Sequence, residues 1–158
     1  IEAKVYLPLT PLDQVQLPEI TVPSAGATFM GAALELLAHE VAANTQKSTA
    51  DAKGDWRPLL FIMTDGSPSD LYAYQQAIPM IQQANFASIV ACAAGPKAKQ
   101  THLLELTDRV VVLDSMDAAS FAGFFKWVSA SVVVGSSSAG LSGSISLPPP
   151  PPEIQLVL

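Results

Sequence analysis

Hydrophobic residues follow two different spacings along this chain. Three short, mainly apolar runs predict buried strands: Leu59–Met63, Phe86–Ala94 and Val110–Leu113. Segments with apolar residues at helical spacing lie before, between and after these runs and predict helices: Phe29–Asn44, Leu71–Ala84, Lys97–Asp108 and the residues from Asp117 onward. Pro79 lies inside the second helical segment and is expected to strain it. Strands that alternate with helices indicate the α/β class with a parallel sheet.

Two further patterns concern the first residues and the last helix. Residues Ile1–Leu9 alternate apolar and polar side chains, which predicts a half-exposed strand, and Pro8 places that strand at a sheet edge. The segment after Asp117 is expected to dock by an aromatic and aliphatic stripe, formed by Phe121, Phe124, Phe125, Val128 and Val132.

The composition changes beyond Gly135. The sequence GSSSAGLSGS is followed by five prolines, Pro148–Pro152. This predicts a folded domain over residues 1–134 and a tail over residues 135–158, flexible first and then similar to polyproline. Such a tail would lie on the domain or reach a partner.

Charge and cysteine content narrow the classes of partner. The chain has 158 residues, 49% hydrophobic, and a net charge of −6 with its few cations scattered, which argues against nucleic acid or an anionic membrane as a partner. Cys92 is the only cysteine and lies in an apolar run, so we expect a buried thiol and a reducing, cytoplasmic compartment. No stretch is expected to reach transmembrane length, and the first residues show no signal peptide.

Asp65 stands where a predicted strand ends, followed by Gly66, which permits a tight turn. Ligands of open α/β sheets gather at the carboxyl ends of strands, so Asp65 is a candidate functional residue. The alternative is an ordinary Asp-Gly turn, with Ser69 or Asp70 capping the next helix.

A second candidate loop precedes the first predicted helix. In SAGATFMGAAL, Gly26 gives the loop conformational freedom and Thr28 places a hydroxyl at the start of the helix. A threonine in that position is also a common N-cap residue.

Together the two loops resemble the von Willebrand factor type A domain, with a closer likeness to its bacterial TerY-type members. The resemblance rests on a Gly-x-Thr loop entering a helix and on a later apolar strand ending in Thr-Asp-Gly. It extends over PLTPL, GATFMGAAL, PLLFIMTDGSPSD, FFKWVS and the proline-rich end. It implies a doubly wound, mostly parallel, Rossmann-like sheet flanked by helices. It also implies a non-catalytic protein-binding module of bacterial tellurium resistance and related stress responses.

The resemblance further implies a metal-ion-dependent adhesion site, usually holding magnesium, although manganese and calcium accept similar oxygen ligands. By this resemblance Thr28 supplies a hydroxyl and Asp65 a carboxylate to the metal. The partner protein would complete the site with an acidic residue. The rim that contacts the partner would include Phe29, Ser67, Pro68 and Asp70.

This sequence departs from the family pattern at one point, because no Asp-x-Ser-x-Ser loop precedes the Gly-x-Thr loop. Asp114 and Ser115 follow a predicted strand but fit better as a strand end before the N-cap of the last helix. Residues Ile1–Leu9 match the third, edge strand of the family. The resemblance therefore places the first strand, first helix and second strand upstream of Ile1, on a separate or cleaved chain. We accordingly expect that the 158 residues do not fold alone.

Two alternatives remain open. One is a magnesium-dependent phosphoryl-transfer or receiver-like domain using Asp65, which would need acidic residues at neighbouring strand ends; Ala94 and Gly95 follow one strand and Asp114 another. The other is a metal-free scaffold. The histidines lack zinc-ligand spacing with Cys92, and the sequence has neither a nucleophile elbow nor a phosphate-binding Gly-rich loop, so an enzyme is unsupported.

Overall fold

The computed structural model describes residues 2–21, 26–137 and 146–157, and the chain divides into two compact units. Unit 1 comprises Ile1–Asp55 and Pro68–Ala84, and unit 2 comprises Trp56–Ser67 and Asn85–Leu158. The chain therefore passes between the units three times, and the expected division near residue 135 falls inside unit 2.

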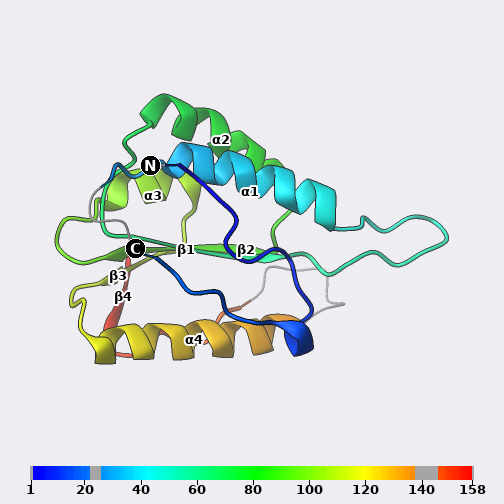
Figure 1. Ribbon diagram of the computed structural model, residues 1–158. Helices are drawn as coiled ribbons and strands as arrows, with labels where there is room; N and C mark the ends of the chain where they lie inside the picture. The colour runs from blue at the N-terminus through cyan, green and yellow to red at the C-terminus, as the bar shows by residue number, and fades with distance from the viewer. Residues whose placement is uncertain (1, 22–25, 138–145, 158) are drawn as a thin grey trace. The chain divides into compact units, whose positions relative to one another are not determined.

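Unit 2 contains a four-stranded sheet in the order β1-β2-β3-β4 (Figure 1). Strands β1 (Leu59–Thr64), β2 (Ser88–Ala94) and β3 (Val110–Leu113) are parallel, and β4 (Ile154–Val157) runs antiparallel to β3. The predicted α/β class and the three predicted strands are confirmed, with β2 and β3 mostly buried and β1 only partly buried. The sheet is open and mostly parallel.

Helices α3 (Gln100–Leu106) and α4 (Ala118–Ser137) belong to the same unit and lie on opposite faces of its sheet (Figure 1). Side chains of a strand alternate between the two faces, so a mostly apolar strand needs cover on both. The α4 face carries a hydrophobic core. Its buried members are Val90, Cys92, Ala94, Val111, Leu113, Phe124, Trp127 and Ile154.

The docking face of α4 differs from the predicted stripe. Phe124 is buried, but Phe125 is 57% exposed and Val132 is also exposed, so the prediction is wrong for these two residues. Trp127 and Ser131 take the inner positions instead, and the Ser131 hydroxyl donates to the Trp127 carbonyl oxygen at 2.8 Å. Positions 124, 127 and 131 follow the spacing of three and four that defines one helix face, and this face shares Phe124 with the predicted stripe. Phe121 and Val128 of that stripe are partly buried against the same core.

The same helix corrects a second expectation. Over Ala118–Ser136, α4 is long and apolar enough, by length and composition alone, to cross a membrane. Lys126 is its only charged residue. Phe124 and Trp127 of this helix pack onto the sheet, and 28% of the span is buried. The core helix of a soluble protein passes the same test of length and composition.

The proline-rich end is part of unit 2. Leu147 packs against the core, the Trp127 indole Nε1–H donates to the Pro148 carbonyl oxygen at 2.9 Å, and Ile154 is buried in β4. Residues 146–157 therefore lie on the domain, which was one of the two arrangements expected for the tail. Residues 138–145 of the expected tail lie outside the described residues. The missed signal was the alternation of Ile154 and Leu156, which is typical of a short strand.

Unit 1 is built on helices α1 (Met30–Asn44) and α2 (Leu71–Gln83), which confirms two predicted helices and the position of Pro79 within the second. The helices approach closely at Gly31. A Cβ atom added there would lie 2.2 Å from the Tyr74 backbone nitrogen and 2.5 Å from the Ala73 carbonyl carbon. The absence of a side chain at this position permits the contact.

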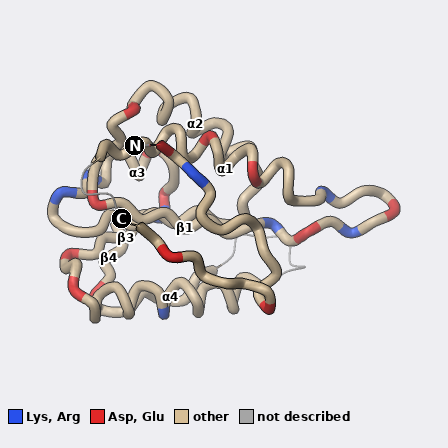
Figure 2. The backbone as a smooth tube through the Cα atoms, in the orientation of Figure 1, with Lys and Arg blue, Asp and Glu red and all other residues tan. Residues whose placement is uncertain are grey.

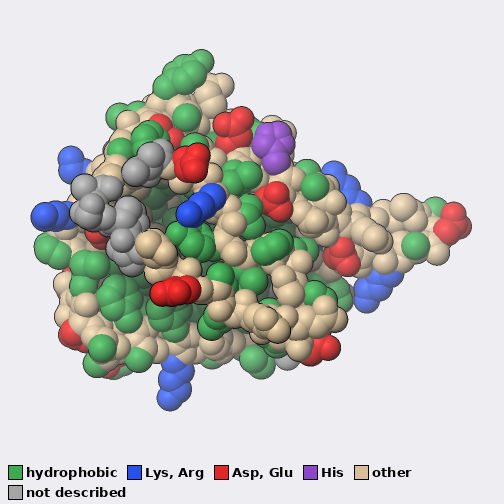
Figure 3. Space-filling view, viewed as in Figure 1, with side chains coloured by type: hydrophobic (Ala, Val, Ile, Leu, Met, Phe, Trp, Pro, Cys, Tyr) green, Lys and Arg blue, Asp and Glu red, His purple; other side chains and the backbone are tan. Residues whose placement is uncertain are grey.

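The expected edge strand at Ile1–Leu9 is wrong, since residues 2–9 form no strand and the first described element is the short 3-10 helix η1 (Leu12–Gln14). An alternating pattern yields a strand only where a neighbour completes the hydrogen-bond ladder. Many apolar side chains of residues 2–21 are exposed, with Leu12 the extreme at 92%. Figure 3 shows hydrophobic groups at the molecular surface among polar and charged ones.

The loop after α1 has internal structure. The Asp55 N–H donates to the Gln46 carbonyl oxygen at 2.9 Å, and the Gln46 N–H donates to the Asp55 carboxylate at 2.7 Å. The loop extends away from the end of α1 (Figure 1) and carries both signs of charge (Figure 2). Hydrogen bonds between Gln46 and Asp55 thus close the base of a loop whose residues are mostly exposed.

Candidate functional site

The loop Asp65–Asp70 connects β1 to α2, and the unit boundary falls inside it, between Ser67 and Pro68. On the unit 2 side, the chain turns directly after β1. The Gly66 N–H donates to the Thr64 hydroxyl oxygen at 3.3 Å, and that hydroxyl lies 3.3 Å from the Gly66 carbonyl oxygen. Thr64 is buried and Asp65 is exposed, so the turn leaves the Asp65 carboxylate at the surface.

On the unit 1 side, the Thr28 loop is bound to the second half of this connection. The Thr28 N–H donates to the Ser69 hydroxyl oxygen at 3.0 Å. In return, the Ser69 N–H donates to the Thr28 carbonyl oxygen at 2.8 Å. Within unit 1, the Thr28 loop therefore contacts Ser69 through the backbone of Thr28 and not through its hydroxyl.

Asp70 secures the same junction by capping a helix other than its own. Its carboxylate oxygens accept the N–H groups of Gly31 at 3.1 Å and Ala32 at 2.9 Å, in the first turn of α1. Amides of a first turn have no partner inside their helix, and a carboxylate there also faces the positive end of the helix dipole. The side chain of Phe29, the N-cap residue of α1, makes no capping bond.

Two local alternatives from the sequence are corrected by this arrangement. Thr28 precedes the N-cap position of α1, so it is not the N-cap. Asp70 occupies the N-cap position of α2, but its side chain makes no capping bond there and serves α1 instead. A short-range rule could not reveal this partner, because it lies 38 residues away in the sequence.

The residues expected at the rim differ in accessibility. Phe29 is exposed and Ser67 is partly exposed, whereas Pro68 is buried. Asp70 is partly buried and committed to α1. Of the four expected rim residues, Phe29 and Ser67 are thus the two whose side chains are accessible and make no hydrogen bond among the described residues.

Three oxygen-bearing side chains, those of Asp65, Ser67 and Thr28, have no hydrogen-bond or ion-pair partner in the part of the chain that the structure describes. Within residues 2–21, 26–137 and 146–157, no hydrogen bond or ion pair engages the Asp65 carboxylate or the hydroxyls of Thr28 and Ser67. Asp65 and Ser67 belong to unit 2 and Thr28 to unit 1. These are oxygen ligands of the kind magnesium accepts. Across the described part of the chain, however, no three His, Cys, Asp or Glu side chains gather as a metal-binding group. The described residues therefore show no assembled metal site.

Ser69 is a residue that the sequence reasoning missed. The letters Asp-x-Ser-x-Ser, absent before Thr28, are spelled by Asp65, Ser67 and Ser69. Assignment of Asp65 to the Thr-Asp-Gly pattern hid this second match. In the structure the Ser69 hydroxyl already accepts the Thr28 N–H, which gives it a structural role in unit 1.

The region after β3 supports the N-cap interpretation. The Ser120 N–H donates to Asp117 Oδ1 at 2.8 Å, at the start of α4. The Ser115 hydroxyl donates to the other Asp117 oxygen. This hydrogen bond and the one from the Ser120 N–H lower the pKa of the Asp117 carboxyl. Asp114 accepts the Gln155 side-chain amide at 2.9 Å.

Cys92 is buried, as expected, and burial raises the pKa of its thiol to about 11. The thiol is therefore protonated at neutral pH and is a poor nucleophile, because the reactive species is the thiolate.

No family model matches the chain, and comparisons with curated proteins and with solved structures also give no match.

Proposed function

We propose that this chain belongs to a von Willebrand factor A-like, non-catalytic module that binds a protein partner through a divalent cation. In this proposal the Asp65 carboxylate and the Thr28 hydroxyl are cation ligands. Phe29 and Ser67 form the accessible part of the partner-binding rim. The setting implied by the family resemblance is a cytoplasmic bacterial stress response of the tellurium-resistance kind.

The observation that carries the proposal is that the polar side chains of this region fall into two groups, one hydrogen-bonded to the fold and one without partners in the described part of the chain. Ser69 and Asp70 bind the Thr28 loop and α1, while the side-chain oxygens of Asp65, Ser67 and Thr28 have no hydrogen-bond or ion-pair partner among the described residues. A binding loop needs such a combination, because some residues hold its backbone while others stay available for a ligand.

The sheet also supports the proposal. Asp65 directly follows the carboxyl end of a parallel strand, which is where open α/β sheets bind ligands. The sequential order of β1, β2 and β3 matches one half of a doubly wound sheet.

Magnesium commonly binds through one or two carboxylates while keeping several waters, so Asp65 and Thr28 are a reasonable partial ligand set. When bound, the cation would bridge Asp65 to a carboxylate of the partner. The remaining ligands would be water and groups outside the described residues.

The proposal is tested with Mn²⁺ as a paramagnetic probe, by recording nuclear magnetic resonance line broadening over the whole chain. We expect broadening centred on Gly66, Ser67 and residues 26–29, with competition by excess Mg²⁺. Asp65→Ala should remove it, whereas Asp51→Ala, which deletes another exposed carboxylate, should leave it unchanged. Broadening that persists in Asp65→Ala would show that the cation binds elsewhere.

A metal-free scaffold is the second candidate, favoured by the lack of any gathered group of three acidic, His or Cys side chains in the described part of the chain. It predicts no site-specific broadening by Mn²⁺ even in the wild-type chain. The receiver-like alternative has less support, because Asp114 is bonded to Gln155. In addition, β2, which lies between β1 and β3, ends at Ala94 and is followed by Gly95, and neither residue is acidic.

A further inference from the structure

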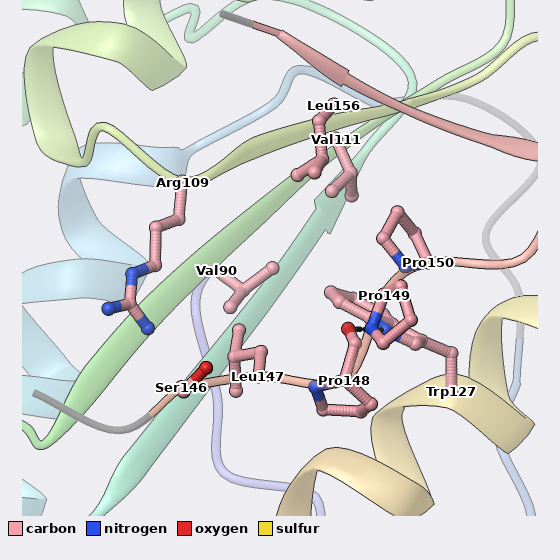
Figure 4. A pocket seen from close by; sticks show the side chains of 10 residues that line it. All are labelled: Val90, Arg109, Val111, Trp127, Ser146, Leu147, Pro148, Pro149, Pro150 and Leu156. Carbon is pink, nitrogen blue, oxygen red and sulfur yellow. Dashed lines mark hydrogen bonds between the residues drawn. The ribbon is translucent and has the colours of Figure 1, made fainter.

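Unit 2 contains a pocket of about 280 Å³ on the α4 face of its sheet (Figure 4). The strands β2 and β3 contribute Val90 and Val111 to its lining, and α4 contributes Trp127. The returning segment 146–150 closes a third side. Leu156, the register partner of Val111 on β4, also lines the pocket and is 50% exposed, which places the pocket within reach of solvent.

The walls of the pocket are held in place by rigid groups. The Trp127 indole is fixed by its hydrogen bond to the Pro148 carbonyl oxygen at 2.9 Å, drawn as a dashed line in Figure 4. The prolines at 148, 149 and 150 fix their own φ angles, and each is followed by another proline, which restricts it to extended backbone. The pocket is therefore largely preformed, as small-molecule sites usually are.

The apolar walls offer no hydrogen-bond donor to a ligand. Proline has no N–H group, the side chains of valine and leucine have no polar atom, and the Trp127 indole N–H already donates to Pro148. Arg109 also lines the pocket, but its guanidinium donates to the Ser88 hydroxyl oxygen at 2.9 Å, and we assign it no contact with a ligand. A charged ligand would lose water and gain no partner from the apolar walls, and the net charge of −6 further disfavours anions.

The size and the flat walls of the pocket narrow the shape of a ligand. An apolar cavity of about 150 Å³ holds one benzene molecule. A pocket of about 280 Å³ therefore has room for two fused rings. Aromatic rings stack on one another, and prolines dock against aromatic surfaces in peptide recognition, so walls of tryptophan and proline suit an aromatic ligand.

From these observations we propose that the pocket binds a small, neutral, bicyclic aromatic compound. The rings of the ligand pack against the Trp127 indole and the proline rings, and their edge contacts Val90. Binding there is independent of the proposed cation site, because neither Thr28 nor Asp65 is among the residues that line the pocket.

Nuclear magnetic resonance titration of the isotope-labelled full chain with unlabelled indole tests the proposal, in the presence of EDTA so that no cation contributes. The readout is the Trp127 Nε1–H signal. Trp56 is the internal control, because it is 52% exposed and does not line the pocket. We expect a saturable shift of the Trp127 signal and none of the Trp56 signal. The dissociation constant should be on the order of 0.1–1 mM, as the small number of non-hydrogen atoms in indole allows.

Two related compounds test the chemistry of recognition. Indole-3-carboxylate adds a negative charge to the same rings and should bind roughly tenfold more weakly or worse. Cyclooctanol is neutral and has as many non-hydrogen atoms as indole but no flat ring. It should bind roughly threefold more weakly or worse, because stacking on Trp127 is lost.

Two pairs of variants test the location. Leu156→Phe should fill the pocket with little risk to folding and abolish indole binding, whereas Leu104→Phe, at 45% exposure on α3, should not change it. Pro149→Ala removes a ring from the wall and should weaken binding several-fold, whereas Pro152→Ala, at an exposed proline outside the lining, should not.

Three results would overturn the proposal. The first is the absence of a saturable shift of the Trp127 signal in the wild-type chain. The second is binding of indole-3-carboxylate or cyclooctanol as tight as that of indole. The third is indole binding that survives both Leu156→Phe and Pro149→Ala.

Discussion

Asp65 and Asp70 lie in the same loop between β1 and α2, but their surroundings differ completely. The Asp70 carboxylate accepts two backbone N–H groups from the first turn of α1. The Asp65 carboxylate is exposed and has no hydrogen-bond or ion-pair partner among the described residues. One acidic residue therefore stabilises the fold, and the other is available for a ligand.

The difference depends on how closely two helices approach. Gly31 has no side chain, so the backbone of Ala73 and Tyr74 can lie against α1. This contact belongs to the same junction in which Asp70, at the start of α2, reaches the amides of Gly31 and Ala32. Asp65 precedes the unit boundary and lies outside this helix pair.

The largest expected effect is a difference in stability between the alanine variants of the two carboxylates. Asp70→Ala should lower the free energy of unfolding by about 2–3 kcal/mol, because two amides lose an ionised acceptor and the helix dipole loses its counter-charge. Asp65→Ala should stay within about 0.5 kcal/mol of the wild type, as exposed substitutions usually do. Urea unfolding followed by far-ultraviolet circular dichroism is suitable, since Trp56 and Trp127 both belong to unit 2 and would not report on α1. Equal losses in the two variants would contradict the comparison.

Gly31→Ala should destabilise the helix pair by about 1–2 kcal/mol. The added Cβ would meet backbone atoms that cannot move aside as a flexible side chain can, at a cost of about 1–3 kcal/mol, partly offset by up to about 1 kcal/mol of better helix propensity. Hydrogen exchange of the Ala32 amide should accelerate in parallel, because the Asp70 cap depends on the same approach. Gly123→Ala on α4 is the control, since its Cβ would meet only a Glu153 side-chain oxygen at 3.9 Å.

Ser69→Ala should cost about 1 kcal/mol, the typical net value of one hydrogen bond, because the Thr28 N–H loses its acceptor. Ser67→Ala removes a hydroxyl from the same loop without removing any recorded hydrogen bond and should have no measurable effect. Paired urea unfolding curves of the two variants distinguish these outcomes. A larger loss in Ser67→Ala would assign Ser67 a structural role.

The smallest effect concerns Asp117, a capping carboxylate that, unlike Asp70, serves its own helix. Its pKa is lowered in the folded state by the Ser115 hydroxyl and the Ser120 N–H. A lowered folded-state pKa contributes stability at pH above the unfolded value of about 3.9, and that contribution is lost as the pH falls through the folded-state pKa. Asp117→Asn keeps an N-cap side chain but removes the charge. It should therefore be less stable than the wild type at pH 7, and the difference should shrink below about pH 4 in unfolding curves measured across pH. A difference that persists at low pH would show that the charge is not the cause.

Much of the chain's local structure was readable in the sequence. The strands at Leu59, Ser88 and Val110 and the helices α1 and α2 follow from unbroken apolar runs and helical spacing, which depend on neighbours a few residues away. The same short-range logic predicted the turn at Asp65 and an N-cap between Asp114 and the last helix, which the structure assigns to Asp117.

Only the tertiary structure decided what those elements contact. The alternating residues 2–9 form no strand because no neighbouring strand pairs with them in the described structure, whereas Ile154–Val157 form one because β3 is beside them. Asp70 binds α1, and Pro148 accepts the Trp127 indole N–H, through contacts between residues distant in sequence. Hydrophobic periodicity shows which side of a segment is buried, but the partner that covers it is determined by packing across the whole chain.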